Sequence, residues 1–135
     1  MKIKGTNKRD TLSGTPDDDT IIGKKSGDIL FGGFGDDHLY GGKGNDRLYG
    51  GPGDNVLKGG KGSDTFVISD DEFDQIRDFQ PGKDNILLVT DDEWIPTGPD
   101  NINPYVDYSG DVLSYKGEPV AQVAHLDPAH DLLYF

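Results

Sequence analysis

Residues 32–67 read GGFGDDHLY GGKGNDRLY GGPGDNVLK GGKGSDTFV, four blocks of nine residues without an insertion. Each block has glycine at positions 1, 2 and 4, aspartate or asparagine at position 6, and a large apolar residue at position 8. The same register extends upstream in weaker form through GTNKRDTLS, GTPDDDTII and GKKSGDILF, which begin at Gly5, Gly14 and Gly23. The chain therefore holds seven consecutive nonapeptide blocks over residues 5–67, and a fixed short period of this kind indicates a repeat architecture.

Position 8 is apolar in every block, and it predicts where the core lies. We expect positions 7–9 to form a short strand whose central side chain points to one face and whose neighbours point to the other. Glycine at positions 1, 2 and 4 lets the remaining residues turn tightly and direct carbonyl oxygens toward one point. Repeated turns and strands then coil into two sheets, with these side chains between them: Leu12, Ile21, Leu30, Leu39, Leu48, Leu57 and Phe66. The expected fold is all-β, a right-handed parallel β-roll (a two-sheet solenoid).

Aspartate at position 6 is the second repeated feature. Two blocks complete one turn of the roll, so side chains two blocks apart lie roughly 4.8 Å from each other. This spacing predicts one column of Asp10, Asp28, Asp46 and Asp64, and a second column of Asp19, Asp37 and Asn55. Carboxylates this close repel one another strongly unless cations lie between them. Flexibly arranged oxygen ligands favour Ca²⁺ over Mg²⁺, whereas the absence of cysteine and the presence of only three histidines argue against zinc.

A glycine-rich flexible linker is the alternative interpretation, since segments rich in glycine and aspartate are commonly disordered. A linker, however, has no reason to place an apolar residue at every ninth position seven times. We therefore expect the linker-like state only when the ions are absent.

Composition limits the other possibilities. A chain of 135 residues predicts one domain, and 33% hydrophobic residues with a mean hydropathy of −0.63 predict a small core. The net charge of −12 resides mostly in residues 68–135, which hold 15 acidic and 3 basic residues, whereas residues 5–67 hold 10 and 8. This balance disfavours nucleic acid and anionic membranes as partners, and no apolar run is long enough to span a membrane. We also expect a monomer. No HExxH motif, cysteine nucleophile or serine motif is present, so we expect no enzyme.

The period stops after Val67, which divides the chain into a roll over residues 1–67 and a capping and secretion region over residues 68–135. Residues 74–88, DQIRDFQPGKDNILL, predict two strands on either side of a Pro-Gly turn. Residues 105–108 and 112–115 flank Ser-Gly-Asp and predict a hairpin, and residues 119–124 predict a further strand. We expect a small β-rich C-terminal cap that closes the open end of the solenoid.

The blocks resemble the calcium-binding β-roll of repeats-in-toxin (RTX, haemolysin-type) proteins. The tail is similar to the C-terminal region of serralysin-type secreted metalloproteases, in which D-x-I-x-D-F-x-x-G-x-D-x-I recurs. The residues that carry this second similarity are Asp74, Ile76, Asp78, Phe79, Gly82, Asp84 and Ile86.

The resemblance to the RTX family implies a ligand set for each ion. One block supplies the carbonyls of positions 2 and 4 and its aspartate, and the block two later supplies the carbonyls of positions 1 and 3 and its aspartate. The best two sites then join Gly42, Gly44 and Asp46 to Gly59, Lys61 and Asp64, and join Gly33, Gly35 and Asp37 to Gly50, Pro52 and Asn55. A third joins Lys24, Ser26 and Asp28 to Gly41, Lys43 and Asp46. Weaker sites pair Asp10 with Asp28, and Asp19 with Asp37, Gly32 and Phe34. This makes about five ions in the roll, with Asp78 or Asp84 as further candidates in the cap, and Asn55 is expected to weaken its site because it lacks a charge.

The resemblance also implies export. RTX proteins leave the cell through type I secretion machinery that reads the C-terminus, and residues 131–135, DLLYF, are similar to the serralysin-type ending. A last strand of the cap is an equally good interpretation of that segment. Residues 1–4 lack the apolar region of a classical secretory signal. We expect a secreted, extracellular calcium-binding module. The alternatives are a polysaccharide-binding module for an alginate-like polymer and the C-terminal fragment of a larger secreted enzyme.

Overall fold

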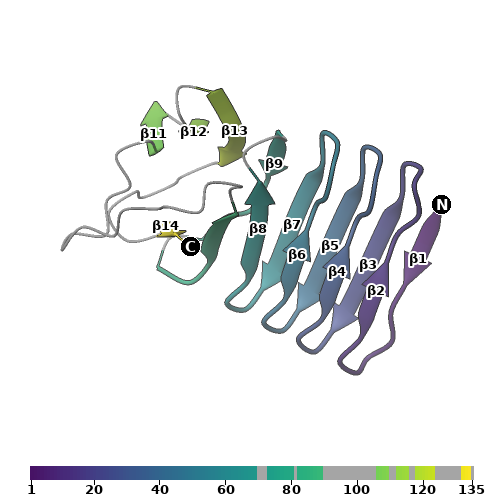
Figure 1. Cartoon of the computed structure of the whole chain (residues 1–135). Coiled ribbons are helices and arrows are strands. Elements are labelled where there is room, and N and C mark those ends of the chain that lie inside the picture. The colour runs from purple at the N-terminus through teal and green to yellow at the C-terminus, as the bar shows by residue number, and fades with distance from the viewer. Residues whose placement is uncertain are drawn as a thin grey trace.

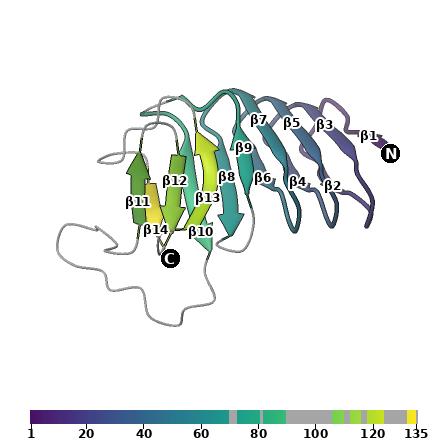
Figure 2. The ribbon, with the colours of Figure 1, turned by 90° about the horizontal axis from the view of Figure 1, so that it is seen from above.

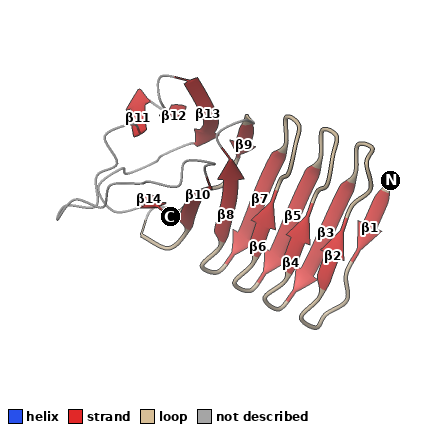
Figure 3. Ribbon diagram, in the orientation of Figure 1, coloured by secondary structure: helices blue, strands red, loops and turns tan. Residues whose placement is uncertain are grey.

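The computed structural model describes residues 1–69, 73–80, 82–89, 106–109, 112–115, 118–123 and 132–134. Within these residues every regular element is a strand (Figures 1 and 3). The first eight strands are β1 (Lys2–Lys4), β2 (Thr11–Ser13), β3 (Thr20–Lys25), β4 (Ile29–Phe31), β5 (His38–Lys43), β6 (Arg47–Tyr49), β7 (Val56–Lys61) and β8 (Thr65–Ser69). The tail adds β9 (Asp74–Ile76), β10 (Asn85–Val89), β11 (Val106–Ser109), β12 (Val112–Tyr115), β13 (Glu118–Val123) and β14 (Leu132–Tyr134).

From β1 to β10, successive strands enter the two sheets alternately, so this part of the chain coils as a β-solenoid (Figures 1 and 2). One sheet has the order β1-β3-β5-β7-β9-β13-β12-β11, and the other has the order β14-β10-β8-β6-β4-β2. From β2 to β8, each strand pairs in parallel with the strand two further along the chain. Residues two blocks apart therefore lie side by side, as Leu30 does with Leu48 and Leu39 with Leu57. The predicted all-β, parallel two-sheet roll is confirmed.

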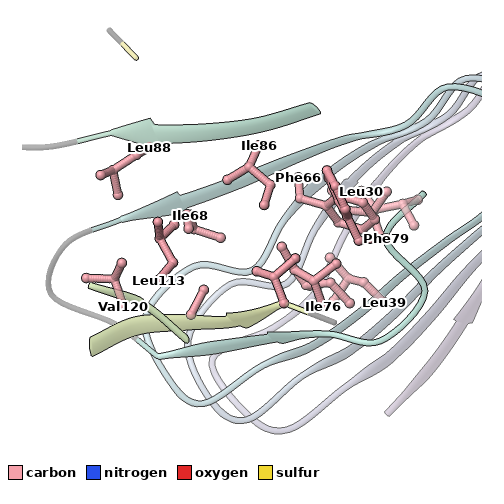
Figure 4. Close-up of a cluster of buried hydrophobic side chains, with 14 of the residues drawn as sticks. Leu30, Leu39, Phe66, Ile68, Ile76, Phe79, Ile86, Leu88, Leu113 and Val120 are labelled. Atoms are coloured by element: carbon pink, nitrogen blue, oxygen red, sulfur yellow. The ribbon is translucent and has the colours of Figure 1, made fainter. Parts of the chain in front are cut away.

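The core follows position 8 of the repeat, as predicted. From the second block to the seventh, the side chain at this position is fully buried: Ile21, Leu30, Leu39, Leu48, Leu57 and Phe66. Leu12, in the first block, is only partly buried because it lies near the open end of the roll. Complete burial of one such side chain stabilises a fold by about 1.5–3 kcal/mol. Figure 4 shows the core continuing from Phe66 through Ile68, Ile76 and Ile86 toward Leu113 and Val120.

The solenoid starts before the first nonapeptide block. Strand β1 pairs in parallel with β3, and Ile3 lies opposite Ile21. Ile3 stands nine residues before Leu12 and so occupies position 8 of a block that lacks its turn. The seven blocks begin at Gly5, so the repeat pattern predicts no strand over residues 2–4.

The tail extends both sheets. The two strands predicted within residues 74–88 are present, and each joins a different sheet: β9 pairs with β7, and β10 pairs with β8. The predicted hairpin is present as β11 and β12, and β13 pairs antiparallel with β12 and parallel with β9. Strand β14 pairs in parallel with β10, so residues 132–134 form a last strand, as one of the two interpretations predicted. The domain boundary at residue 67 stays a prediction, and the sheets run across it.

Candidate metal centre

The turns between strands carry position 6 of the repeat, and its side chains point inward. Asp19, Asp28, Asp37, Asp46, Asn55 and Asp64 are each at most 3% exposed. Asp10, in the first turn, is partly exposed. Among the residues that the structure describes, no group of three or more histidine, cysteine, aspartate or glutamate side chains is arranged to hold a metal. Any cation between these turns would therefore take most of its ligands from the backbone.

A hydrogen-bond ladder joins the position-6 side chains into the two predicted columns. The Oδ1 atom, a carboxylate oxygen in aspartate and the amide oxygen in Asn55, accepts the backbone N–H of the position-6 residue two blocks earlier, at 2.7–2.9 Å. In the first column the ladder runs from Asp10 through Asp28, Asp46 and Asp64 to Oδ1 of Asp84. In the second column it runs from Asp19 through Asp37 to Asn55. Both columns thus have a fixed register.

The second carboxylate oxygen, Oδ2, distinguishes the later blocks. In Asp28, Asp37, Asp46 and Asp64 this atom is buried and has no hydrogen-bond partner. A buried charged oxygen without a partner is costly, and native structures leave few such atoms unexplained. Four atoms of the same kind, repeated at the same place in the turn, indicate that a ligand outside the chain completes them.

Burial also alters the acidity of these groups. It raises the pKa of the Asp28, Asp37, Asp46 and Asp84 carboxyls above the usual range. The pKa of Asp64 rises to about 6, chiefly through burial and to a smaller extent through the charges of Asp84, Asp46 and Asp78. Without a counter-charge these carboxylates take up a proton more readily than an ordinary aspartate does, and a cation beside them would oppose that shift.

Glycine leaves the space that these oxygens need. A Cβ at Gly41 would collide with Oδ2 of Asp46, and a Cβ at Gly59 would collide with Oδ2 of Asp64. The carbonyl oxygens of positions 2 and 4 approach the next turn equally closely. A Cβ at Gly42 would meet the carbonyl of Lys24, and one at Gly44 would meet the carbonyl of Ser26. Each junction between turns therefore gathers carboxylate and carbonyl oxygens, the hard donor set that Ca²⁺ takes.

The same backbone conformation begins at the third block. Gly42 and Gly44 have φ of 115° and 123°, and Lys24 and Ser26 adopt φ of 89° and 75° at the matching positions without glycine. Thr6 and Thr15, at position 2 of the first two blocks, do not have positive φ. Their backbone N–H groups instead donate to Oδ2 of Asp10 and Asp19 at 2.6 Å.

Asp19 differs from the later aspartates in a second way. The N-terminal ammonium of Met1 lies 2.9 Å from its Oδ1. The Thr15 hydrogen bond and this ammonium together lower the pKa of Asp19, although burial acts against them. In the first two turns, a backbone N–H of the same turn therefore satisfies the Oδ2 atom that is unpaired in later turns.

The remaining predicted ligands are backbone carbonyl oxygens. The carbonyls of Lys61 and Pro52 accept the N–H groups of Gly44 and Gly35, at 2.8 and 3.1 Å, which leaves a second lone pair on each. Other predicted carbonyls lie against the glycine of a neighbouring turn. They belong to Gly32, Gly33, Gly35, Gly41, Gly42, Gly44, Gly50 and Gly59. Lys43 lies in β5, where it pairs with Lys25 and Lys61, and the Phe34 side chain is exposed.

Both candidates in the tail lie beside the last turn of the roll. Asp84 continues the first column, and its Oδ2 accepts the Gln80 N–H at 2.9 Å. Asp78 lies outside the columns, and its two oxygens accept the N–H groups of Gly59 and Gly60. The repeat pattern predicts no ligand at Asp74, which is buried and continues the second column beyond Asn55. Asp74 lies 19 residues after Asn55, so a strict 18-residue period does not include Asp74, although the tail motif does.

Comparison with known proteins agrees with this geometry. A family model described as RTX calcium-binding nonapeptide repeat (4 copies) matches residues 4–39 and 31–66. The chain thus contains a domain of haemolysin-type RTX repeats folded as a β-roll, and calcium binding follows from that family. No curated protein matches the chain. The similarity of the tail to serralysin-type proteases receives no support from these comparisons, and it stays a prediction.

Proposed function

We propose that the chain is a secreted calcium-binding module that folds when Ca²⁺ enters the junctions between its turns. The observation that carries this proposal is the set of four buried, unpaired Oδ2 atoms on Asp28, Asp37, Asp46 and Asp64. Those of Asp28, Asp37 and Asp46 lie beside a backbone carbonyl oxygen of the next turn. Bound Ca²⁺ would supply the positive charge that neither a hydrogen bond nor a salt bridge provides at these atoms.

This argument changes the expected number of ions. Three junctions within the roll have an unpaired oxygen: Asp28 with Asp46, Asp37 with Asn55, and Asp46 with Asp64. A fourth junction joins Asp64 to Asp84, where the Gln80 side chain already donates to the Gly60 carbonyl. In the first two blocks, the backbone N–H groups of Thr6 and Thr15 donate to the matching Oδ2 atoms. We therefore propose about four principal sites in place of the five roll sites expected from the repeat count.

Linkage relates occupancy of these sites to folding. Extracellular calcium modules bind with Kd of about 10⁻⁴ M, so about 2 mM calcium contributes roughly 1.8 kcal/mol for each site. Four sites contribute roughly 7 kcal/mol, which is comparable to the whole stability of a typical domain, about 5–15 kcal/mol. At submicromolar calcium this contribution vanishes, while the repulsion between buried carboxylates remains. The chain would then stay unfolded inside a cell and fold outside it.

The second part of the proposal is that type I secretion machinery exports the unfolded chain. An unfolded chain suits threading through type I secretion machinery, and the C-terminal residues 131–135 are the candidate signal because of their similarity to RTX exports. Strand formation at Leu132–Tyr134 is compatible with that role, since the segment would pair with β10 only after folding. The described residues contain no helix long and apolar enough to cross a membrane. We propose a binding module rather than an enzyme, acting either alone or as the C-terminal part of a larger secreted protein.

Calorimetric titration with calcium, combined with far-ultraviolet circular dichroism, tests this function. Calcium should bind at about four sites and induce β structure, whereas magnesium at the same concentration should not, because it demands a tight octahedron. Equal β content with calcium and with chelator would refute the proposal.

A pair of neighbouring variants provides the control. Asp37 is buried, whereas Asp36 is more exposed, and its Oδ1 accepts the Asp54 N–H. D37N should remove one bound ion, and D36N should leave the number unchanged. Equal loss in both variants would show that total charge, and not the position-6 carboxylate, determines binding.

A polysaccharide is the second candidate ligand, and one surface feature favours it. An open hollow of about 430 Å³ on β5, β7 and the residue after β9 is lined by His38, Tyr40, Val56, Lys58 and Arg77. An aromatic ring beside two cations suits an acidic sugar, which stacks on the ring and pairs with the charges. Titration with alginate oligosaccharides would measure this binding. K58A combined with R77A should abolish it, whereas binding that survives both substitutions would exclude this surface.

A further inference from the structure

At one junction between stacked turns, that of Asn55 with Asp74, hydrogen bonds within the protein take the place of a cation. Asn55 replaces aspartate at position 6 of the sixth block, and its side chain is fully buried. Its Oδ1 accepts the Asp37 N–H at 2.9 Å, as the carboxylate Oδ1 does in neighbouring blocks. That hydrogen bond requires an acceptor, so it fixes which terminal atom is oxygen. The amide nitrogen Nδ2 must therefore take the place that Oδ2 takes in an aspartate block.

Nδ2 points to the oxygens that would surround an ion. It donates to the Gly51 carbonyl at 2.7 Å and to Oδ1 of Asp74 at 2.9 Å, and it also lies 3.3 Å from the Gly53 carbonyl. These atoms are the position-2 carbonyl, the position-4 carbonyl and the carboxylate of the following turn. The matching Oδ2 atoms of Asp28, Asp37, Asp46 and Asp64 have no hydrogen-bond partner.

Charge explains the difference between these junctions. A carboxylate facing carbonyl oxygens and a second carboxylate presents only acceptors, and a cation must complete the arrangement. An amide presents two hydrogens to the same acceptors and brings only one negative charge, that of Asp74, into the junction. A hydrogen bond to a charged acceptor is among the stronger kinds, so no ion is required.

We infer that the Asn55–Asp74 junction is closed to calcium and that the Asn55 amide substitutes there for the ion. This inference rests on the proposed function, because it presumes that calcium fills the other junctions. Asp74 begins β9, so the amide also attaches the first strand of the tail to the roll without a metal. In the folded chain, this contact between the tail and the roll therefore contains no bound ion.

Substitution N55D tests the inference. It replaces Nδ2 by an oxygen and recreates the donor set of the other junctions. Equilibrium dialysis followed by elemental analysis should count one more calcium per chain in N55D than in the unaltered chain. In chelator N55D should be less folded, because two carboxylates then face each other without a counter-charge. N45D is the matched control, since Asn45 lies on the surface and its Oδ1, which accepts the Ser63 N–H, is retained. N45D should bind the same number of ions as the unaltered chain.

D74N supplies a second measurement in case N55D fails to fold. If the junction is closed, D74N leaves the number of bound ions unchanged, whereas loss of one ion in D74N overturns the inference. Equal ion counts for N55D and the unaltered chain, with calcium bound to both, also overturn it while leaving the proposed function intact. Absence of calcium binding by every chain overturns both.

Discussion

Acidification should partly replace calcium in folding the ion-free roll. The pKa of Asp64 is about 6 in the folded chain, against an ordinary value of 3.8. The folded state therefore holds a proton at pH values where the unfolded state has lost it. Stability from this group is fully present below about pH 4 and is lost as the pH rises through about 6. The carboxyls of Asp28, Asp37, Asp46 and Asp84 act in the same direction.

The size of the effect follows from the Asp64 value. A rise of the pKa from 3.8 to about 6 corresponds to at most about 3 kcal/mol of stability between the two ends of that range. Solvent beside the turn screens the carboxylate and reduces this figure. Even half of it would shift a chain that is marginally folded in chelator toward the folded state.

Circular dichroism in chelator, at about pH 7 and about pH 5, measures the effect. The β content should rise on acidification, and D64N should lose a large part of the rise because its amide does not titrate. With calcium present the order should reverse, since protons compete with the ion for the same oxygens. Equal or lower β content at about pH 5 in chelator would refute the idea that buried carboxylate charge opposes folding of the roll.

Two pairs of substitutions, each a test with its control, probe packing and backbone geometry in the calcium-loaded chain, with urea unfolding as the assay. L48A should cost about 2–5 kcal/mol because Leu48 is fully buried, whereas L12A at the partly buried end should cost clearly less; equal costs would contradict the assignment of the core. G42A should destabilise the chain by more than about 1 kcal/mol because Gly42 has φ of 115° and an added Cβ would collide with the Lys24 carbonyl. Gly82 has φ of 76°, and no atom lies within 4 Å of a Cβ added there, so G82A should cost only the backbone strain. An equal loss of stability in G82A and G42A would exclude the collision as a cause.

Periodicity was sufficient to predict the roll. A side chain that recurs every nine residues alternates between two sheets, and one that recurs every 18 stacks on itself. Leu39 therefore had to lie beside Leu57, and Asp28 beside Asp46, once the turns were assumed to be equal. The prediction weakened where the spacing changed. Asp74 follows Asn55 by 19 residues and Asp84 follows Asp64 by 20, yet both continue the columns, because an inserted residue can lie in a turn without disturbing the strands on either side.

The first two blocks show a different limit of the repeat pattern. Asp10 and Asp19 fit the pattern as well as Asp46 does, but the residue at position 2 decides what their second oxygen meets. Threonine there keeps φ negative and donates its N–H to the carboxylate. Lys24, in the third block, adopts positive φ without being glycine, so the identity of the residue alone does not predict the conformation. Its carbonyl lies against Gly42, and stacking on the next turn compensates for the local strain.

The sequence alone does not state which of its two neighbouring junctions each terminal atom of a position-6 side chain faces, and Asn55 is an example. Each position-6 residue lies between two junctions, and its two terminal atoms face opposite ways along the column. From sequence, asparagine was expected to weaken the site it shares with Asp37 by removing a charge. In the structure a neutral amide oxygen of Asn55 accepts the Asp37 N–H, where an aspartate would present a carboxylate oxygen, and the amide nitrogen faces Asp74. The weakening of the site shared with Asp37 stays a prediction. The loss of charge therefore also affects the following junction, and only the direction of the side chain, which no repeat pattern contains, reveals this second effect.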